Sequence, residues 1–329
     1  MNGRFLLLLM ALLFTQILGA QTVLFGKNQQ APADTVPKRI DKALNFLAFG
    51  DWGRNGADHQ IPVAQTMSKV AEQLRPSFYV VTGDNFYPSG VVSEKDPLWT
   101  YSLENIYSDF VFQWDWYPVL GNHDYKSNPG AQVAYSKISR RWKMESRYYS
   151  KLFPINDDTT QQVLMVFIDT NPLIAEFYKN KEYGPNVRTQ DSTAQLKWIK
   201  KQLSISNTNI KWKILVGHHP MYSAGGRENG YDTKSIRGTL KPLFDKYGVD
   251  LYIAGHEHSL QYLHDSQAVT HHFISGAASE STPVHNTDMV QMAASAYGFM
   301  FFSIQSGVVT IQTISDSGKL ISFNQILKK

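Results

Sequence analysis

The chain has 329 residues, of which 43% are hydrophobic and 18% charged, a composition typical of globular proteins that excludes a largely disordered chain. The formal net charge is only +4, and Lys and Arg do not cluster among aromatic residues, so we expect no nucleic-acid partner. The absence of cysteine excludes disulfides, thiolate metal ligands and a cysteine nucleophile.

Residues 1–20 have the layout of a secretory signal peptide. Arg4 precedes an apolar run over residues 5–14, and Gly19 and Ala20 are small residues suited to cleavage. The run is short for a bilayer, so a retained membrane anchor is the lesser alternative. We therefore expect an exported protein without stable membrane insertion.

The remaining chain divides into two parts. Residues 21–40 show little periodicity and predict an exposed leader, and residues 41–329 predict a single domain. The sequence also lacks an Asn-x-Ser/Thr sequon. An exported protein with neither cysteine nor sequon is typical of a bacterial envelope or medium, so we expect a periplasmic or secreted protein, acting as a monomer.

Five apolar segments predict buried strands, and each ends in a turn that carries Asp, Asn or His. The segments are residues 43–49, 78–81, 116–120, 210–216 and 249–254. The turns are Gly50-Asp51-Trp52-Gly53, Gly83-Asp84-Asn85-Phe86-Tyr87, Gly121-Asn122-His123-Asp124, Gly217-His218-His219-Pro220 and Gly255-His256-Glu257-His258. In α/β sheets, sites form beyond the carboxyl ends of strands, so these turns should converge.

Segments with helical spacing lie between the strands. One covers residues 60–75, and another covers residues 236–247. The pattern Ser192-x-x-Gln195 predicts a capping box at the start of a third helix. The long polar stretch 171–188 suggests a lid or partner surface. With a tail that predicts antiparallel strands after residue 271, the chain should adopt an α/β (α+β) fold, a two-sheet β-sandwich flanked by helices.

The turns provide side chains that can bind metal ions. The candidates are Asp51, Asp84, Tyr87, Asn122, His218 or His219, His256 and His258. Mixed oxygen and nitrogen donors suit iron, zinc or manganese, and a phenolate suits a trivalent ion, iron above all. Asp84 could bridge two ions. His256 and His258 alternate along an extended segment and therefore diverge, which suits one ligand for each ion.

Taken singly, a Gly-Asp or Gly-Asn pair is also explained as an ordinary turn. The metal-site interpretation rests on five such turns in the same place relative to a strand. The remaining histidines lack this context, and we interpret them as surface or core residues. They are His59, His264, His271, His272 and His285.

The five turns together resemble the sequence blocks of the calcineurin-like metallophosphoesterases. Tyr87 in the second block is the mark of purple acid phosphatases within that superfamily. Residues 134–142 and the segment Leu260-Gln261-Tyr262-Leu263 are similar to the small, mammalian-type tartrate-resistant acid phosphatases. The similarity spans about residues 44–315 and implies the metallophosphoesterase fold.

The resemblance also implies a ligand set. Fe(III) would be held by Asp51, Tyr87, His258 and a bridging Asp84. A second ion, Fe(II), Zn or Mn, would be held by Asp84, Asn122, His218 and His256. Val216-x-x-His219 also fits the fourth block literally, but its Gly-His-x-Pro frame indicates His218. His219 would then contact substrate or neighbouring ligands, or have a plain structural role.

The activity implied is hydrolysis of phosphomonoesters, from small molecules or phosphoproteins, by attack of a metal-bound hydroxide at acid pH. His123 would bind phosphate and assist departure of the alcohol. Where family members place a further histidine, this chain has Arg227, which could hold phosphate instead. The cysteines that tie the long loop in animal relatives are also missing, so the 171–188 segment need not act as the same regulatory flap.

Two other functions fit parts of this pattern. One is a phosphodiesterase or nucleotide-directed enzyme of the wider superfamily, against which Tyr87 argues. The other is a metal-binding surface protein without catalysis, against which the complete ligand set argues. Comparing the hydrolysis of monoesters and diesters by metal-replete protein distinguishes all three.

Overall fold

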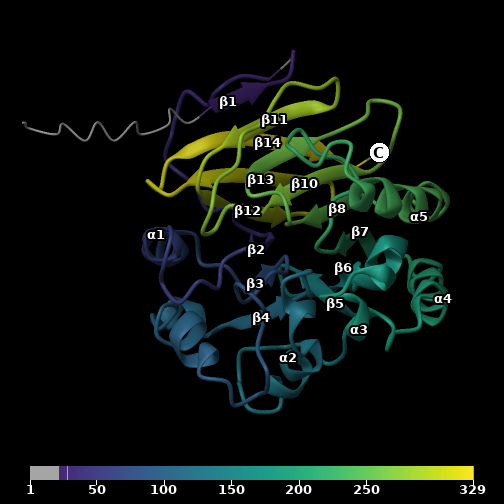
Figure 1. Ribbon diagram of the computed structural model, residues 1–329. Coiled ribbons are helices and arrows are strands. Elements are labelled where there is room, and N and C mark those ends of the chain that lie inside the picture. The colour runs from purple at the N-terminus through teal and green to yellow at the C-terminus, as the bar shows by residue number, and fades with distance from the viewer. Residues whose placement is uncertain (1–21, 28, 329) are drawn as a thin grey trace, which may run out of the picture.

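A computed structural model describes residues 22–27 and 29–328 of the chain. Two β-sheets lie face to face with helices around them (Figure 1). This arrangement confirms the predicted α/β two-sheet fold. The predicted signal peptide, residues 1–20, lies outside the described residues.

The first sheet has six strands in the order β14-β13-β12-β2-β3-β4. Their bounds are β2 Leu44–Phe49, β3 Phe78–Val81, β4 Asp115–Pro118, β12 Gly298–Ile304, β13 Val308–Ser315 and β14 Leu320–Leu327. β2, β3 and β4 are parallel neighbours, and β12 to β14 continue the sheet in antiparallel fashion. The carboxyl ends of the three parallel strands therefore share one edge.

The second sheet has eight strands in the order β1-β11-β9-β10-β8-β7-β6-β5. Their bounds are β1 Thr22–Phe25, β5 Tyr149–Ile155, β6 Asp158–Phe167, β7 Ile210–Val216, β8 Leu251–Ala254, β9 Leu260–Leu263, β10 His271–Ser275 and β11 Val290–Ser295. β6, β7 and β8 are parallel. β10, predicted as antiparallel, is antiparallel to β9 but parallel to β8.

Aromatic side chains join the two sheets into one core. Phe302 of β12 meets Phe273 of β10 edge to face, with ring centroids 5.3 Å apart. Phe78 of β3 stacks on Phe153 of β5 at 4.3 Å. Large apolar rings of this kind contribute most of the burial that holds packed sheets together. The two sets of strand ends are thereby fixed relative to each other.

The α-helices are α1 Gln60–Leu74, α2 Pro129–Tyr135, α3 Gly184–Val187, α4 Ser192–Leu203 and α5 Tyr231–Tyr247. Figure 1 shows α1 beside the strands of the six-stranded sheet, with α4 and α5 beside β6 to β8. Within residues 22–27 and 29–328, none of the helices is long and apolar enough to cross a bilayer.

The predicted capping box of α4 is wrong. Asp191 is the N-cap, and its side chain accepts a hydrogen bond from the Ala194 backbone N–H at 2.9 Å. The Gln195 side chain instead pairs with the backbone of Asp169, just after β6, through two hydrogen bonds of 2.9 Å. A buried backbone turn needs such partners, and Gln195 meets that need.

Two stretches contain more regular structure than the sequence predicts. β1 lies within the expected leader and pairs with β11 at the sheet edge. The 171–188 segment contains two short 3₁₀-helices, η4 Asn171–Leu173 and η5 Ala175–Lys179, followed by α3. The segment therefore consists largely of short helices rather than of an irregular loop.

Candidate metal centre

The five predicted turns meet at one edge shared by the two sheets. Asp51, Asp84, Tyr87 and Asn122 come from the six-stranded sheet, and His218, His256 and His258 come from the eight-stranded sheet. The Thr82 carbonyl oxygen, at the end of β3, lies 2.8 Å from His218 Nδ1 across the sheet interface. All seven predicted ligand residues are brought together.

One half of the site is built around the Tyr87 hydroxyl. This oxygen lies 3.2 Å from Asp51 Oδ1, 3.2 Å from Asp84 Oδ2 and 3.1 Å from His258 Nε2. Asp51 and Asp84 are buried. Two carboxylates, a phenol and an imidazole thus converge on one point.

The other half is built around His218 Nε2. It lies 3.2 Å from Asn122 Oδ1, 3.1 Å from His256 Nδ1 and 3.4 Å from Asp84 Oδ2. Asp84 therefore faces both halves, through contacts with Tyr87 and with His218. This is the position that a bridging carboxylate requires.

The outward-facing nitrogen of each histidine assigns its tautomer. His218 Nδ1 faces the Thr82 carbonyl at 2.8 Å, His256 Nε2 faces Asp232 Oδ2 at 2.8 Å, and His258 Nδ1 faces Glu280 Oε2 at 3.0 Å. Each of these oxygens accepts a hydrogen bond, so the outward nitrogen donates its proton. The inward nitrogens then hold lone pairs aimed at the centre, and such convergent lone pairs fit metal ions.

The charge balance of the site also fits a cation. Burial raises the pKa of Tyr87 well above its ordinary value, and the carboxylates of Asp84 and Asp51 add to the rise. Burial opposes ionisation of Asp84, yet the positive charge of a protonated His218 would hold the pKa of that carboxyl well below its usual range, and a bound metal ion would supply such a charge in place of the proton. A phenolate can form among these carboxylates only if a strong positive charge lies against it.

The backbone at the site adopts conformations that are rare for residues with side chains. Asp51, Asp84 and His256 have φ angles of 59°, 46° and 70°, all in the left-handed region. Asp and His tolerate this region better than most residues, and such strain concentrates at functional sites. Each of these residues directly follows a glycine at a strand end.

Gly121 allows the turns to approach one another closely. A Cβ atom at this position would lie 2.1 Å from Asp84 Oδ1 and 2.3 Å from the Asp84 backbone nitrogen. Such contacts are far too short, and moving the carboxylate away would disturb the 2.8 Å hydrogen bond that it accepts from the His123 backbone N–H. Glycine is therefore required beside Asp84.

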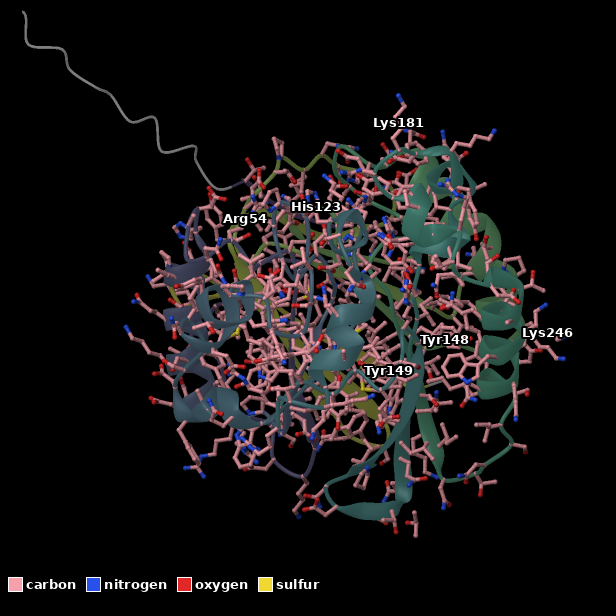
Figure 2. All side chains as sticks on the ribbon, turned by 60° about the horizontal axis from the view of Figure 1, so that its bottom comes forward. Arg54, His123, Tyr148, Tyr149, Lys181 and Lys246 are labelled. Carbon is pink, nitrogen blue, oxygen red and sulfur yellow. The ribbon has the colours of Figure 1, made fainter. Side chains whose placement is uncertain are left out.

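The predicted substrate residues lie in different settings. His123 is half-buried, and its Nδ1 lies 2.7 Å from the Pro88 carbonyl oxygen, so Nε2 is the nitrogen that can meet a substrate. Figure 2 shows His123 on the same side of the molecule as Arg54. Arg227 Nη1 lies 3.1 Å from Asp232 Oδ2, so its guanidinium is already paired.

His219 is fully buried behind the ligand residues. Its ring centroid lies 4.3 Å from that of His256, and its Nδ1 lies 2.7 Å from Thr170 Oγ1. Its Nε2 has no hydrogen-bond partner among the described residues. Burial lowers the pKa of His219 well below its ordinary value, so the ring stays neutral.

Four residues near the site are not predicted from the sequence. Asp232 and Glu280 orient His256 and His258, and Arg54 lies over the Tyr87 ring. The Tyr183 hydroxyl lies 3.4 Å from Asn122 Nδ2. Only Tyr183 had an indirect signal, the length of the segment that contains it.

The paired sheets and the ligand-type side chains at their shared edge define a metallophosphoesterase. The family model for the Calcineurin-like phosphoesterase matches residues 44–260, and the chain belongs to this family. The predicted resemblance is confirmed. This family membership and the donor groups of the site together support a dinuclear metal centre.

Curated relatives place the chain among the purple acid phosphatases. It is 36% identical to purple acid phosphatase 17 of Arabidopsis thaliana, over 74% of this chain and 71% of the relative. It is 33% identical to tartrate-resistant acid phosphatase type 5 of Homo sapiens, over 84% of this chain and 89% of the relative.

A solved structure has a similar fold. The structure of GAP50, described as the anchor in the inner membrane complex of Plasmodium, superposes with a TM-score of 0.73 at 25% identity. The match covers 87% of this chain and 89% of that chain. The whole two-sheet architecture is therefore shared.

Proposed function

We propose that the protein is an exported acid phosphatase that hydrolyses phosphomonoesters at a centre of Fe(III) and a second ion, Fe(II), Zn or Mn. The observation that carries the proposal is the convergence of three histidine lone pairs and four oxygen-bearing side chains on one buried edge. The family membership supports the reaction class.

The residues divide into two ligand sets. Asp51, Tyr87 and His258 would hold the ferric ion, because the phenol oxygen lies among them. Asn122, His218 and His256 would hold the second ion. Asp84 contacts both sets and would bridge them. Ligand atoms on the histidines would be Nε2 of His218 and His258 and Nδ1 of His256, since the other nitrogens donate outward.

When bound, the two ions would supply the chemistry of other dinuclear sites, polarising phosphate oxygens and acidifying water. His123 Nε2 would hold the phosphate and assist the leaving alcohol. Arg227 is a weaker phosphate ligand than the sequence suggests, because Asp232 already holds its guanidinium. His219 faces the ligand histidines rather than solvent, so we assign it a supporting contact with His256.

The direct test is hydrolysis by the metal-replete protein. An aryl phosphate monoester should be hydrolysed faster at pH 5 than at pH 7, and much faster than the matching bis-aryl diester. Preference for the diester would indicate the phosphodiesterase alternative. Full metal content without turnover would indicate a non-catalytic metal-binding protein.

The ferric assignment has its own test. Protein purified with iron should show a visible phenolate-to-iron band, and Tyr87→Phe should lose that band while keeping the fold. A colourless, active protein that contains only zinc would contradict the ferric assignment but leave the phosphatase proposal intact.

Export has support from the sequence pattern of residues 1–20. We expect the purified mature protein to begin near Gln21, as measured by intact mass after expression in a host with a secretion pathway. A full-length cytoplasmic product would contradict it.

A further inference from the structure

Tyr183 brings a hydroxyl group to the site that the proposed reaction does not yet use. This hydroxyl oxygen lies 3.4 Å from Asn122 Nδ2, which donates a hydrogen bond to it. The other polar atom of the same amide, Asn122 Oδ1, faces His218 Nε2 at 3.2 Å. The hydroxyl therefore lies next to a predicted ligand of the second ion, although it comes from the 171–188 segment rather than from a strand-end turn.

The Tyr183 hydroxyl has a proton that the fold does not use. In the part of the chain that the structure describes, the oxygen accepts a hydrogen bond from Asn122 and donates none. Burial raises the pKa of Tyr183 above its ordinary value, so the hydroxyl keeps this proton at acid pH. Beside a site that binds an anion, such a proton is available for a hydrogen bond to a charged oxygen, and hydrogen bonds of that kind are the stronger ones.

The backbone around Tyr183 is anchored next to the site. Asn186 Nδ2 donates hydrogen bonds to the backbone carbonyl oxygens of Tyr125 and Ser127, at 2.8 Å and 2.5 Å. The Tyr183 ring packs on the ring of Phe177, with centroids 4.7 Å apart. These contacts hold the hydroxyl in position, so it can meet a ligand without a rearrangement of the segment.

The known phosphate donor of the site lies on its other half. The ring of His123 lies 4.4 Å from that of Tyr87, so His123 serves the half that is built around the Tyr87 hydroxyl. On the half that contains Asn122, the guanidinium of Arg227 is already paired with a carboxylate. Tyr183 is the residue that offers this half an unused donor.

We propose that Tyr183 is a further catalytic residue, whose hydroxyl donates a hydrogen bond to a phosphate oxygen of the substrate on the Asn122 side of the site, as His123 does on the Tyr87 side. The inference rests on the proposed phosphatase function. The hydroxyl keeps its proton, so no proton transfer is assigned to it. Phosphate oxygens carry charge in the substrate and in the released phosphate, so the contact should strengthen binding of both.

The test is Tyr183→Phe, which removes the hydroxyl and keeps the ring that packs on Phe177. Inorganic phosphate is the probe, and titration calorimetry with the metal-replete protein measures its Kd. We expect this Kd to rise by about tenfold to a hundredfold, the range for one hydrogen bond to a charged acceptor. The KM for an aryl phosphate should rise by a similar factor, with a smaller change in kcat.

A purely structural role of Tyr183 gives a different result. If the hydroxyl only oriented Asn122, Tyr183→Phe would lose the second ion to a competing chelator more readily than the wild type. We expect equal retention of both ions. Weaker metal retention, unchanged phosphate affinity, or faster hydrolysis, as for a side chain that only blocks the site, would each overturn the proposal.

Tyr178→Phe is the matched control, because it removes a hydroxyl from the same segment. The Tyr178 hydroxyl donates to the Pro172 carbonyl oxygen at 3.1 Å, away from the ligand residues. Its loss should leave the Kd for phosphate unchanged, and equal effects of the two variants would contradict the inference. If the wild type hydrolyses no monoester, the proposed function fails. If the wild type is active and Tyr183→Phe binds phosphate equally well, only the present inference fails.

Discussion

The two sheets contribute different chemistry to the same site. The predicted ligands from the six-stranded sheet, Asp51, Asp84, Tyr87 and Asn122, all present oxygen. Those from the eight-stranded sheet are all histidines and present nitrogen. In the proposed assignment each ion takes ligands from both sheets. Neither sheet holds a complete set, so the centre depends on how the sheets pack and should in turn stabilise that packing.

The difference extends to how each side chain is held. The carboxylates on the oxygen side are held by backbone N–H groups: Asp51 Oδ2 accepts from His256 at 3.0 Å and Asp84 Oδ1 from His123 at 2.8 Å. Two of the histidines are held by carboxylates of distant segments, Asp232 and Glu280. Both kinds of support come from other segments of the chain, since His256 is 205 residues from Asp51 and His123 is 39 residues from Asp84.

The largest expected effect comes from the residue that joins both halves. Asp84→Asn keeps the shape of the side chain but removes its charge, so both ions lose a shared ligand. We expect activity to fall by about a thousandfold, which corresponds to roughly 4 kcal/mol of lost transition-state stabilisation. Metal analysis should show fewer than two ions per chain. Asp288→Asn, at an exposed carboxylate, is the control, and full activity of Asp84→Asn would contradict the bridging role.

The second largest loss of activity is expected where Gly121 packs against Asp84, among the oxygen ligands of the six-stranded sheet. In Gly121→Ala, the new methyl group would meet Asp84 Oδ1 at 2.1 Å and push the carboxylate aside. Displacement of a catalytic group by about 1 Å can cost about a hundredfold in rate. We expect a loss of about tenfold to a hundredfold in kcat/KM. Gly307→Ala, whose methyl group meets nothing within 4 Å, should be unaffected; equal effects of the two variants would argue against a site-specific role.

The support of the histidine ligands from the eight-stranded sheet can be tested at Asp232, which contacts His256. Asp232→Asn keeps the size of the side chain but weakens its hold on His256 Nε2. Loss of the residue that accepts a hydrogen bond from a metal-binding histidine lowers metal affinity by about tenfold to a hundredfold. We expect this loss for the second ion in Asp232→Asn. Competition with a chelator measures it. Asp245→Asn, an exposed residue of the same helix, is the control. Unchanged metal retention would show that Asp232 does not orient His256.

A histidine of the eight-stranded sheet that lies away from the site should affect the stability of the fold rather than metal binding. His272 of β10 is buried, its Nδ1 has no hydrogen-bond partner among the described residues, and burial lowers its pKa to about 3. The unfolded chain binds a proton at His272 near pH 6.5, and the folded chain does not. The contribution of neutral His272 to the free energy of unfolding is therefore present above that pH and is lost as the pH falls toward 3. Between pH 7 and pH 5 the loss is about 2 kcal/mol.

His272→Gln should remove this part of the acid sensitivity. We expect urea unfolding to show about 2 kcal/mol less loss of stability between pH 7 and pH 5 than in the wild type. An identical slope in the variant and the wild type would mean that His272 is protonated without cost in the fold.

The sequence predicts this site well because its signal is local. Each strand-end turn holds its ligand within a few residues of a buried apolar run, and parallel strands bring their carboxyl ends to one edge. The supporting residues are less predictable because they approach from elsewhere in the chain. Glu280 and Asp232 reach their histidines from a loop and a helix start, and no spacing marks either of them.

Local patterns also compete with one another in the fold. Ser192-x-x-Gln195 matches a capping box, but Asp191 is the better cap and Gln195 is drawn to the buried backbone of Asp169. β1 forms because β11 offers an open edge, not because of its own four residues. Such choices depend on which partner is available in three dimensions, and a sequence pattern does not contain that information.

The most direct test of the dinuclear centre is anomalous diffraction from crystals of the iron-loaded protein, recorded above the zinc absorption edge, where iron, manganese and zinc all give a signal. We predict two metal peaks at the shared edge of the sheets, one beside Asp51, Tyr87 and His258, the other beside Asn122, His218 and His256. Asp84 should lie between them. A single peak, or peaks away from these residues, would contradict the account.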